Sequence, residues 1–186
     1  EFKKHENSVG RYNAGFAAFR NSQEGIKILN WWKDLCKENC TAVPEDGMLG
    51  DQKYLDDMTR VFDGVYDSSH KGLNTAPWNI QAYNTQYVDG KVTVDDEPLL
   101  LYHFQGIRIF GKYLFDLYPG ATRIPRSVVQ HIYKPYMRAI ASSYVVLEKI
   151  EDGFSLGSER FLSSPRQIAF YGKRILMRIC NLVFNW

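Results

Sequence analysis

Residues 87–94 read Tyr-Val-Asp-Gly-Lys-Val-Thr-Val, two short strand-like runs joined by Asp89 and Gly90. An Asp-Gly pair between such runs favours a tight antiparallel hairpin, because its turn needs residues that tolerate positive φ angles. This is the strongest local signal in the chain. The continuous apolar run Leu99–Phe104 follows it and predicts a further strand that contains His103 near its end. The region therefore predicts a small β-sheet.

Helical and strand-like segments alternate on the N-terminal side of this hairpin. Tyr12–Arg20 has the apolar and small residues of a buried strand, and it leads into a helix predicted over Gln23–Asn39, with a possible cap at Asn21-Ser22. We expect this helix to pack its apolar face on a sheet. A short helix is predicted after Gly50, and Val61–Tyr66 has strand composition. Mixed elements of this kind predict an α/β or α+β sheet domain.

The character of the sequence changes after Pro119-Gly120. Val128–Ile150 predicts an accessory helix with one early proline, and a Gly/Ser-rich connector follows over Glu151–Pro165. Gln167–Trp186 has the pattern of a basic amphipathic helix, which suits either the surface of an anionic membrane or docking on the sheet domain. By role we divide the chain into a sheet domain (1–120), an accessory helix (121–150) and a linker with a C-terminal helix (151–186).

Composition limits the class of protein. The chain has 186 residues, 23 Lys+Arg and 21 Asp+Glu, for a net charge of +2, and 45% of its residues are hydrophobic. These values exclude a wholly disordered chain, and the sparse cations predict no nucleic-acid partner. The odd number of cysteines favours reduced cytoplasmic thiols over a disulfide framework or a zinc site.

Neither a membrane span nor a signal peptide is predicted. No apolar stretch approaches the roughly 20 residues that a membrane-spanning helix needs. The first residues have no hydrophobic segment and no initiator Met, so we expect a fragment of a longer protein.

Several polar residues are candidates for a site, each with a structural alternative. His103, followed by Gly106, suits a metal or phosphate site, or a hydrogen-bonded structural histidine. Asp51 and Gln52, at the start of a short helix, suit either a polar ligand or a helix cap. Trp78 lies in a proline-containing loop over Asn74–Asn79, where its ring could stack on a sugar. Two helix tryptophans, Trp31 and Trp32, are more typical of a core.

Together these motifs resemble a known family. The segments Tyr12–Phe16, Gly50–Asp56, Gly72–Asn79 and Tyr102–Gly106 occur in the order found in bacterial nucleotide-sugar glycosyltransferases. Over residues 10–118 the chain resembles the acceptor-side half of a GT-A-fold enzyme related to glycosyltransferase family 8. The resemblance implies an α/β fold that forms the C-terminal part of a GT-A mixed sheet, with a β-hairpin and a helical C-terminal extension. It also implies a role in surface-polysaccharide or lipopolysaccharide synthesis.

The resemblance assigns roles to residues near the sugars. Asn13, Ala14 and Gly15 match a turn that lines the sugar site, and the catalytic pair Asp51 and Gln52 matches residues that touch the transferred sugar. The loop residues that would bind substrate are Asn74, Trp78 and Asn79.

The resemblance also implies a metal and a diphosphate site. His103 would complete the coordination of a divalent cation, Mn²⁺ or Mg²⁺, and the backbone of Gly106 would approach the donor diphosphate. The basic residue of this family falls on Ile109 in this chain, so Arg108 or Lys112 would supply the positive charge. Such charges stabilise a departing diphosphate, which gains negative charge as the sugar leaves.

The sequence contains no Asp-x-Asp, the motif that supplies the other metal ligands in GT-A enzymes. Asp95-Asp96-Glu97 follows the hairpin and reads as a solvated turn. We therefore expect a catalytically incomplete part of a metal-dependent cytoplasmic enzyme, peripheral to the inner face of the membrane if residues 167–186 bind lipid. The full enzyme would move a sugar from a nucleotide donor, such as a UDP-linked one, to a saccharide or lipid-linked acceptor.

Two alternatives remain at this point. One is a non-catalytic glycan- or protein-binding domain, in which the same polar loops act without a donor. The other is a hydrolase that uses Asp51 with Asp56 or Asp57, which would need two carboxylates on either side of a bond.

Overall fold

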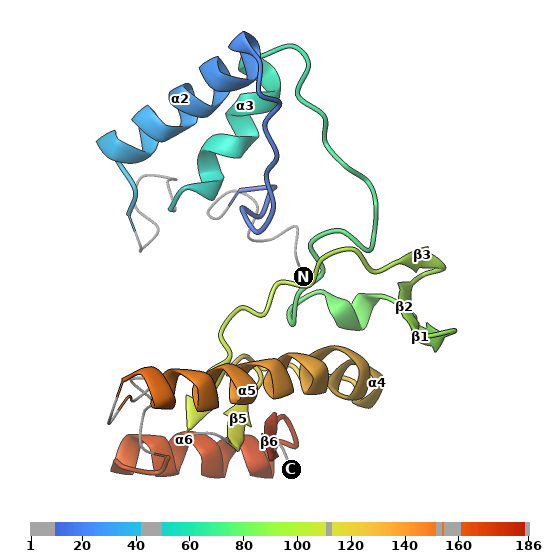
Figure 1. The fold of residues 1–186 in the computed structure, drawn as a ribbon, viewed down its shortest axis with the longest axis vertical. Coiled ribbons are helices and arrows are strands. Elements are labelled where there is room, and N and C mark those ends of the chain that lie inside the picture. Colours follow the sequence, from blue (N-terminus) through green and yellow to red (C-terminus); the bar gives the residue numbers. More distant parts are fainter. Residues whose placement is uncertain (1–9, 42–49, 111–112, 152–153, 155–160, 185–186) are drawn as a thin grey trace. The chain divides into compact units, whose positions relative to one another are not determined.

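The computed structural model describes residues 10–41, 50–110, 113–151, 154 and 161–184. The chain forms two compact units, residues 1–69 and 70–186. Helices and strands are mixed along it, and two three-stranded antiparallel sheets lie in the second unit (Figure 1). The mixed fold class predicted from the sequence is confirmed. The division by role at residues 120 and 150 stays a prediction.

The described part of the first unit is helical. It contains α2 (Gln23–Glu38), a 3₁₀ turn η2 (Gln52–Tyr54) and α3 (Leu55–Val61). Ser22 caps α2, because its side chain accepts a hydrogen bond from the Gly25 backbone N–H at 3.2 Å. The predicted capped helix is thus confirmed to within one residue at its end.

Two predicted strands of the first unit are wrong. Tyr12–Arg20 has no strand, and its Phe16 side chain is 46% exposed. Val61 ends α3, and Phe62–Tyr66 is irregular. Strand-favouring side chains need a neighbouring strand to pack against, and the described residues of this unit offer none. Helix α2 therefore packs near α3 rather than on a sheet, and Trp31 meets Phe62 edge-on at 5.3 Å between ring centroids.

The first sheet contains the predicted hairpin. Strands β1 (Thr85–Val88), β2 (Lys91–Val94) and β3 (Glu97–Pro98) pair in that order, with Val88 opposite Lys91. Asp89 and Gly90 have φ angles of 49° and 79°, as the tight turn requires. Asp95 and Asp96 also have positive φ angles and form the turn between β2 and β3, so the interpretation of Asp95-Asp96-Glu97 as a turn is confirmed.

The prediction of a strand over Leu99–Phe104 is wrong, because this segment forms no regular strand. The segment runs beside Gly72–Thr75 but makes one isolated parallel bridge, between Thr75 and Tyr102. The backbone N–H groups of Leu100 and Leu101 both donate to the carbonyl of Gly72, at 2.8 and 3.1 Å. Two donors on one acceptor break the spacing of a parallel ladder, so no regular strand forms.

The second sheet corrects the prediction for the C-terminus. It contains β4 (Arg108–Phe110), β5 (Leu114–Asp116) and β6 (Leu182–Phe184), paired in that order. The C-terminal helix α6 covers only Pro165–Leu176, and Arg178 then takes a left-handed φ of 55°. The predicted helix over Gln167–Trp186 therefore ends early, because its last apolar residues pair with β5 instead. The connector that precedes α6 lies largely outside the described residues.

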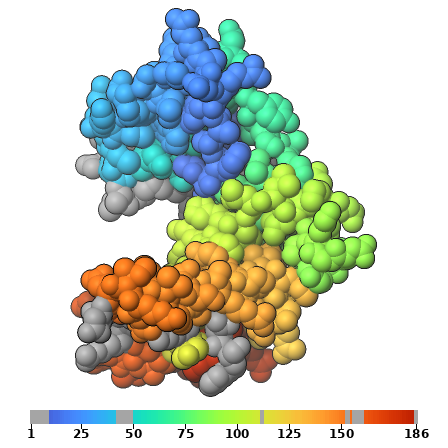
Figure 2. All heavy atoms as spheres, in the orientation of Figure 1, coloured from blue at the N-terminus to red at the C-terminus, as the bar shows by residue number. Residues whose placement is uncertain are grey.

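The helix predicted over Val128–Ile150 is confirmed and begins two residues earlier. It runs through α4 (Arg126–Val128), a π-helical turn η4 (Val129–Tyr133) and α5 (Lys134–Ile150). Pro135 has no N–H to donate to the carbonyl four residues before it, which explains the wider π turn at this point. The outward face of α5 (orange) is visible at the surface of the second unit in Figure 2.

The core of the second unit joins this helix to both sheets. Tyr133 and Met137 of the helix are fully buried with Val94 of β2 and Phe115 of β5. Among the described helices, none is long and apolar enough to cross a bilayer.

Candidate functional site

In the second unit, His103 is fixed to the loop that contains Asn74, Trp78 and Asn79. The backbone N–H of His103 donates to the carbonyl of Thr75 at 2.7 Å, next to the Thr75–Tyr102 bridge. Thr75 is 1% exposed, so water does not compete for this bond. The positions of the histidine and of the loop are therefore coupled.

The loop is also closed on itself. The side-chain oxygen of Asn79 accepts a hydrogen bond from the Ala76 N–H at 2.7 Å, and the Asn79 N–H donates to the Ala76 carbonyl at 3.1 Å. Asn74 has a left-handed φ of 61°, which asparagine tolerates better than most residues. The predicted defined loop is confirmed. The Asn79 amide is used partly to hold it, a role that sequence reasoning did not assign.

Trp78 and His103 lie in contact. Their ring centroids are 5.4 Å apart, the planes make an angle of 77°, and both residues are half-buried. A half-exposed indole beside an imidazole suits a saccharide, because the indole can cover the apolar face of a pyranose while the imidazole binds a hydroxyl. The structure thus brings the predicted site residues Trp78 and His103 into contact, on the loop that also contains Asn74 and Asn79.

An aromatic cluster anchors the residue next to this histidine. The Tyr102 hydroxyl donates to that of Tyr133 at 3.2 Å, and Phe104 packs edge-on against both rings. Burial raises the pKa of Tyr102 and of Tyr133 well above the ordinary tyrosine value. Both phenols therefore stay neutral, and the segment that contains His103 is firmly held.

The residues predicted for the diphosphate lie further along this segment. Gly106 is exposed and has a φ of 75°, a conformation that favours glycine. Arg108 lies in β4 opposite Asp116, with its guanidinium 5.5 Å from the ring centroid of Phe170 in α6. Lys112 lies outside the described residues. Arg108 thus contacts α6, and a joint phosphate site of these residues stays a prediction.

The other predicted site residues lie in the first unit, in two tight turns. The Asn13 side-chain oxygen accepts a hydrogen bond from the Gly15 N–H at 2.7 Å, which closes a turn around Ala14. The Asp51 carbonyl accepts a hydrogen bond from Trp32 Nε1 at 2.9 Å, and Gln52 begins η2.

The interpretation of Asp51 as a helix cap is wrong. Its side chain makes no capping hydrogen bond, and its backbone is already helical (φ −85°, ψ −24°), whereas a capping residue is normally extended. The exposed Asp51 carboxylate is therefore not used by the helix.

Asp56 of α3 links the segment just before the Asn13–Gly15 turn to the residues that follow Asp51. Its carboxylate accepts from the Arg11 backbone N–H at 2.8 Å and from Lys53 Nζ at 2.7 Å. Asp57 pairs with Arg60. The two carboxylates considered for a hydrolase with Asp51 are thus both engaged in ion pairs, which weakens that alternative.

The described residues do not fit a complete metal site. Nowhere in this part of the chain do three or more His, Cys, Asp or Glu side chains lie close enough together to hold an ion. His103 offers one imidazole ligand, whereas protein sites for Mn²⁺ or Mg²⁺ use several oxygen-rich ligands. All three cysteines, Cys36, Cys40 and Cys180, are free thiols.

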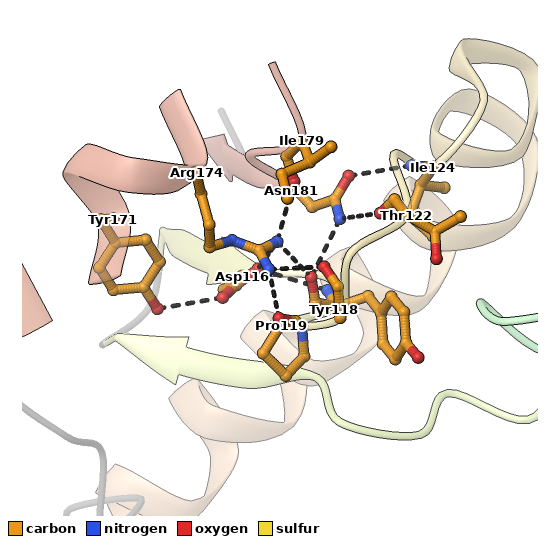
Figure 3. Close-up of polar contacts among 10 residues, drawn as sticks. Asp116, Tyr118, Pro119, Thr122, Ile124, Tyr171, Arg174, Ile179 and Asn181 are labelled. Atoms are coloured by element: carbon orange, nitrogen blue, oxygen red, sulfur yellow. Dashed lines mark hydrogen bonds and ion pairs between the residues drawn. The ribbon is translucent and has the colours of Figure 1, made fainter. Parts of the chain in front are cut away.

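Sequence reasoning missed a buried polar network in the second unit (Figure 3). Arg174 of α6 is 4% exposed and donates to the carbonyls of Tyr118, Pro119, Gly120 and Ile179. Asp116, fully buried, lies 3.9 Å from this guanidinium and accepts from the Tyr171 hydroxyl at 3.0 Å. The amphipathic pattern of α6 indicates which face of the helix contains Arg174, but it does not indicate which segments of the chain bury that face. The network is structural, because it satisfies the carbonyls of the turn after β5.

No family model matches the sequence. The chain is 34% identical over 148 residues to the uncharacterized protein YfnF of Bacillus subtilis (strain 168), an alignment that covers 79% of this chain and 49% of YfnF. It is 33% identical over 138 residues to the uncharacterized protein YfnD of the same organism, covering 73% and 44%. The chain thus spans about half the length of these curated relatives. No solved structure matches it.

Proposed function

We propose that this chain is the acceptor-side half of a GT-A-fold glycosyltransferase related to glycosyltransferase family 8. The whole enzyme transfers a sugar from a nucleotide-diphosphate donor to a saccharide or lipid-linked acceptor in bacterial surface-polysaccharide or lipopolysaccharide synthesis. The observation that supports it most is the contact of Trp78 with His103 on the closed loop that also contains Asn74 and Asn79.

The loop residues bind the saccharide in this proposal. The Trp78 ring covers an apolar sugar face, and the amides of Asn74 and Asn79 bind hydroxyls. Because hydrogen bonds already fix this loop, little conformational entropy is lost on binding. In the first unit, Asp51 and Gln52 contact the transferred sugar, and the turn Asn13–Gly15 lines its site.

The leaving diphosphate needs positive charge. The diphosphate approaches the backbone of Gly106, which has no side chain to block it, and Arg108 or Lys112 supplies the positive charge. A divalent ion is also expected for such enzymes, but the described residues contain no cluster of three or more His, Cys, Asp or Glu side chains to hold it. We therefore assign no step to a metal and propose metal dependence for the longest natural form of the protein only.

A membrane-surface contact through residues 167–186 belongs to the same proposal. On α6, Ile168, Ile175 and Leu176 are 56%, 61% and 86% exposed, and the exposed cations Arg166 and Lys173 flank them. Apolar side chains beside cations suit the surface of an anionic bilayer, where lipid-linked acceptors lie. The enzyme would then act in the cytoplasm at the inner face of the membrane.

Release of nucleoside diphosphate from a panel of nucleotide sugars tests the proposal. The longest natural form should release it with at least one donor when acceptor is present, and Asp51→Asn should lower the rate. No release with any donor, together with saccharide binding that needs Trp78, would instead favour the non-catalytic glycan-binding domain.

A further inference from the structure

A cavity of about 310 Å³ lies in the second unit, separate from the Trp78–His103 site. Its lining residues come from the loop after β5, the start of the long helix and the chain that leads into β6. Its polar lining residues are Arg123, Arg126, Gln130, Lys134, Cys180 and Asn181. The volume is at the lower end of the range for small-ligand pockets.

The lining is strongly positive. It includes three cationic side chains and no carboxylate. Within the part of the chain that the structure describes, none of Arg123, Arg126 and Lys134 forms an ion pair. Asp116, next in sequence to the lining residue Leu117, is bound to Tyr171 and lies near Arg174 instead. Three cations facing one hollow without an internal counter-charge favour an anionic ligand.

The fold positions these cations. Arg126, Gln130 and Lys134 are four residues apart along one continuous helix, so they form a single stripe on its surface. The stripe crosses the π-helical turn Val129–Tyr133, and such turns are frequent at functional sites.

The loop that contains Arg123 is held on both sides. Asn181 accepts from the Ile124 N–H at 2.9 Å and donates to the Thr122 carbonyl at 2.8 Å (Figure 3). Gln81 donates to the Arg123 carbonyl at 2.5 Å. The backbone around this arginine is therefore fixed before any ligand arrives, which lowers the entropy cost of binding.

We propose that this cavity binds a phosphate or diphosphate group. Arginine and lysine donors match phosphate oxygens, and Gln130 adds a neutral donor. The lining also includes the apolar residues Leu117, Val129 and Leu182, so the phosphate is part of a ligand with an apolar portion. That ligand is either a soluble phosphorylated compound or a lipid headgroup. The proposal stands whether or not the chain belongs to a glycosyltransferase.

The first test is calorimetric titration of the 186-residue chain with inorganic pyrophosphate, at constant ionic strength in chloride. The double variant Arg126→Gln/Lys134→Gln should bind at least about tenfold more weakly, since each lost charge-assisted hydrogen bond is worth about that factor. The matched control, Lys91→Gln/Lys149→Gln, makes the same change in net charge at exposed positions outside the cavity and should bind as the parent does. Equal weakening in both variants would overturn the proposal, because it would indicate general charge attraction.

The rate of thiol alkylation measures binding independently of calorimetry. Cys180 lines the cavity, whereas Cys36 and Cys40 lie in the other unit. Pyrophosphate should slow the reaction of Cys180 with iodoacetamide several-fold and leave the other two rates unchanged. If neither pyrophosphate nor vesicles that contain phosphatidic acid change the alkylation rate of Cys180, the proposed site is contradicted.

Vesicles distinguish the source of the phosphate. If phosphatidylcholine vesicles containing phosphatidic acid bind the chain through Arg126 and Lys134 and protect Cys180, while pyrophosphate does not, the ligand is a lipid headgroup. If pyrophosphate alone gives these effects, the ligand is soluble. Binding of either probe that the double variant retains in full would overturn the proposal.

Discussion

The indole of Trp78 meets the imidazole of His103 edge to face, with 5.4 Å between the ring centroids. These residues are 25 positions apart in sequence, and the hydrogen bond from the His103 N–H to Thr75 brings their segments together. The contact gives the proposed sugar site a preformed aromatic wall. It also predicts that changes at either residue affect the other.

Replacing Trp78 with Ala should weaken binding of the preferred saccharide by roughly tenfold, because the stacking surface is lost while the loop keeps its hydrogen bonds. Trp78→Phe should recover part of the affinity. Titration of saccharides followed by protein NMR measures this, and His131→Ala is a control because that imidazole stacks on Tyr87 instead. Equal saccharide binding by parent and Trp78→Ala would remove Trp78 from the site.

Replacing Arg174 with Ala should lower the free energy of unfolding of the second unit by about 3–5 kcal/mol, because buried Asp116 loses its counter-charge and several carbonyls lose their donor. Arg174→Lys should recover little, since one ammonium cannot reach carbonyls on several sides. Urea unfolding measures both. Lys173→Ala, at the exposed neighbour, should change stability by less than about 0.5 kcal/mol. A similar small change for Arg174→Ala would show that the network is not structural.

Stability should fall at alkaline pH. Burial, and then the charge of Asp116, raise the pKa of Tyr171 to about 12. In the unfolded chain this phenol ionises near its ordinary pKa of about 10. The contribution of Tyr171 to the free energy of unfolding is therefore complete below pH 10 and is lost as the pH rises toward 12. Thermal unfolding between pH 8 and 11 should show the loss, and Tyr171→Phe should reduce it. Tyr102 and Tyr133 also lower the stability at alkaline pH. If Tyr171→Phe has the same dependence of thermal stability on pH as the parent, Tyr171 does not cause this loss.

Replacing Asp56 with Ala should release the segment before Asn13 from the helix after Asp51, because both the Arg11 N–H and Lys53 lose their acceptor. Hydrogen exchange of the Arg11 amide should accelerate at least tenfold, since a hydrogen bond to a carboxylate is worth about 1.5–3 kcal/mol. Asp34→Ala, at an exposed ion pair on α2, is the control. If Arg11 exchanges at the parent rate, Asp56 does not hold this segment.

Local signals were predicted best from the sequence. The Asp89-Gly90 turn and the Ser22 cap each depend on a few neighbouring residues, and both are present. The errors at Tyr12–Arg20 and in the C-terminal helix arose where the outcome depends on a distant partner. Strand β6 exists because β5 lies beside it, which no local pattern shows.

The candidate site follows the same rule. The sequence identified Trp78 and His103 separately, but their contact depends on the long-range pairing of Thr75 with Tyr102. The amphipathic pattern of residues 167–186 did not indicate that Arg174 is buried, for the same reason. The spacing of Arg126, Gln130 and Lys134 could have indicated the cationic stripe, since all three recur at four-residue intervals.

Calorimetric titration of UDP with Mn²⁺ into the longest natural form of the protein tests the glycosyltransferase proposal most directly, with His103→Ala and the control His131→Ala beside it. The proposal predicts metal-dependent binding that His103→Ala weakens and His131→Ala does not. Absence of binding to UDP and to other nucleoside diphosphates tried in the same way would contradict it.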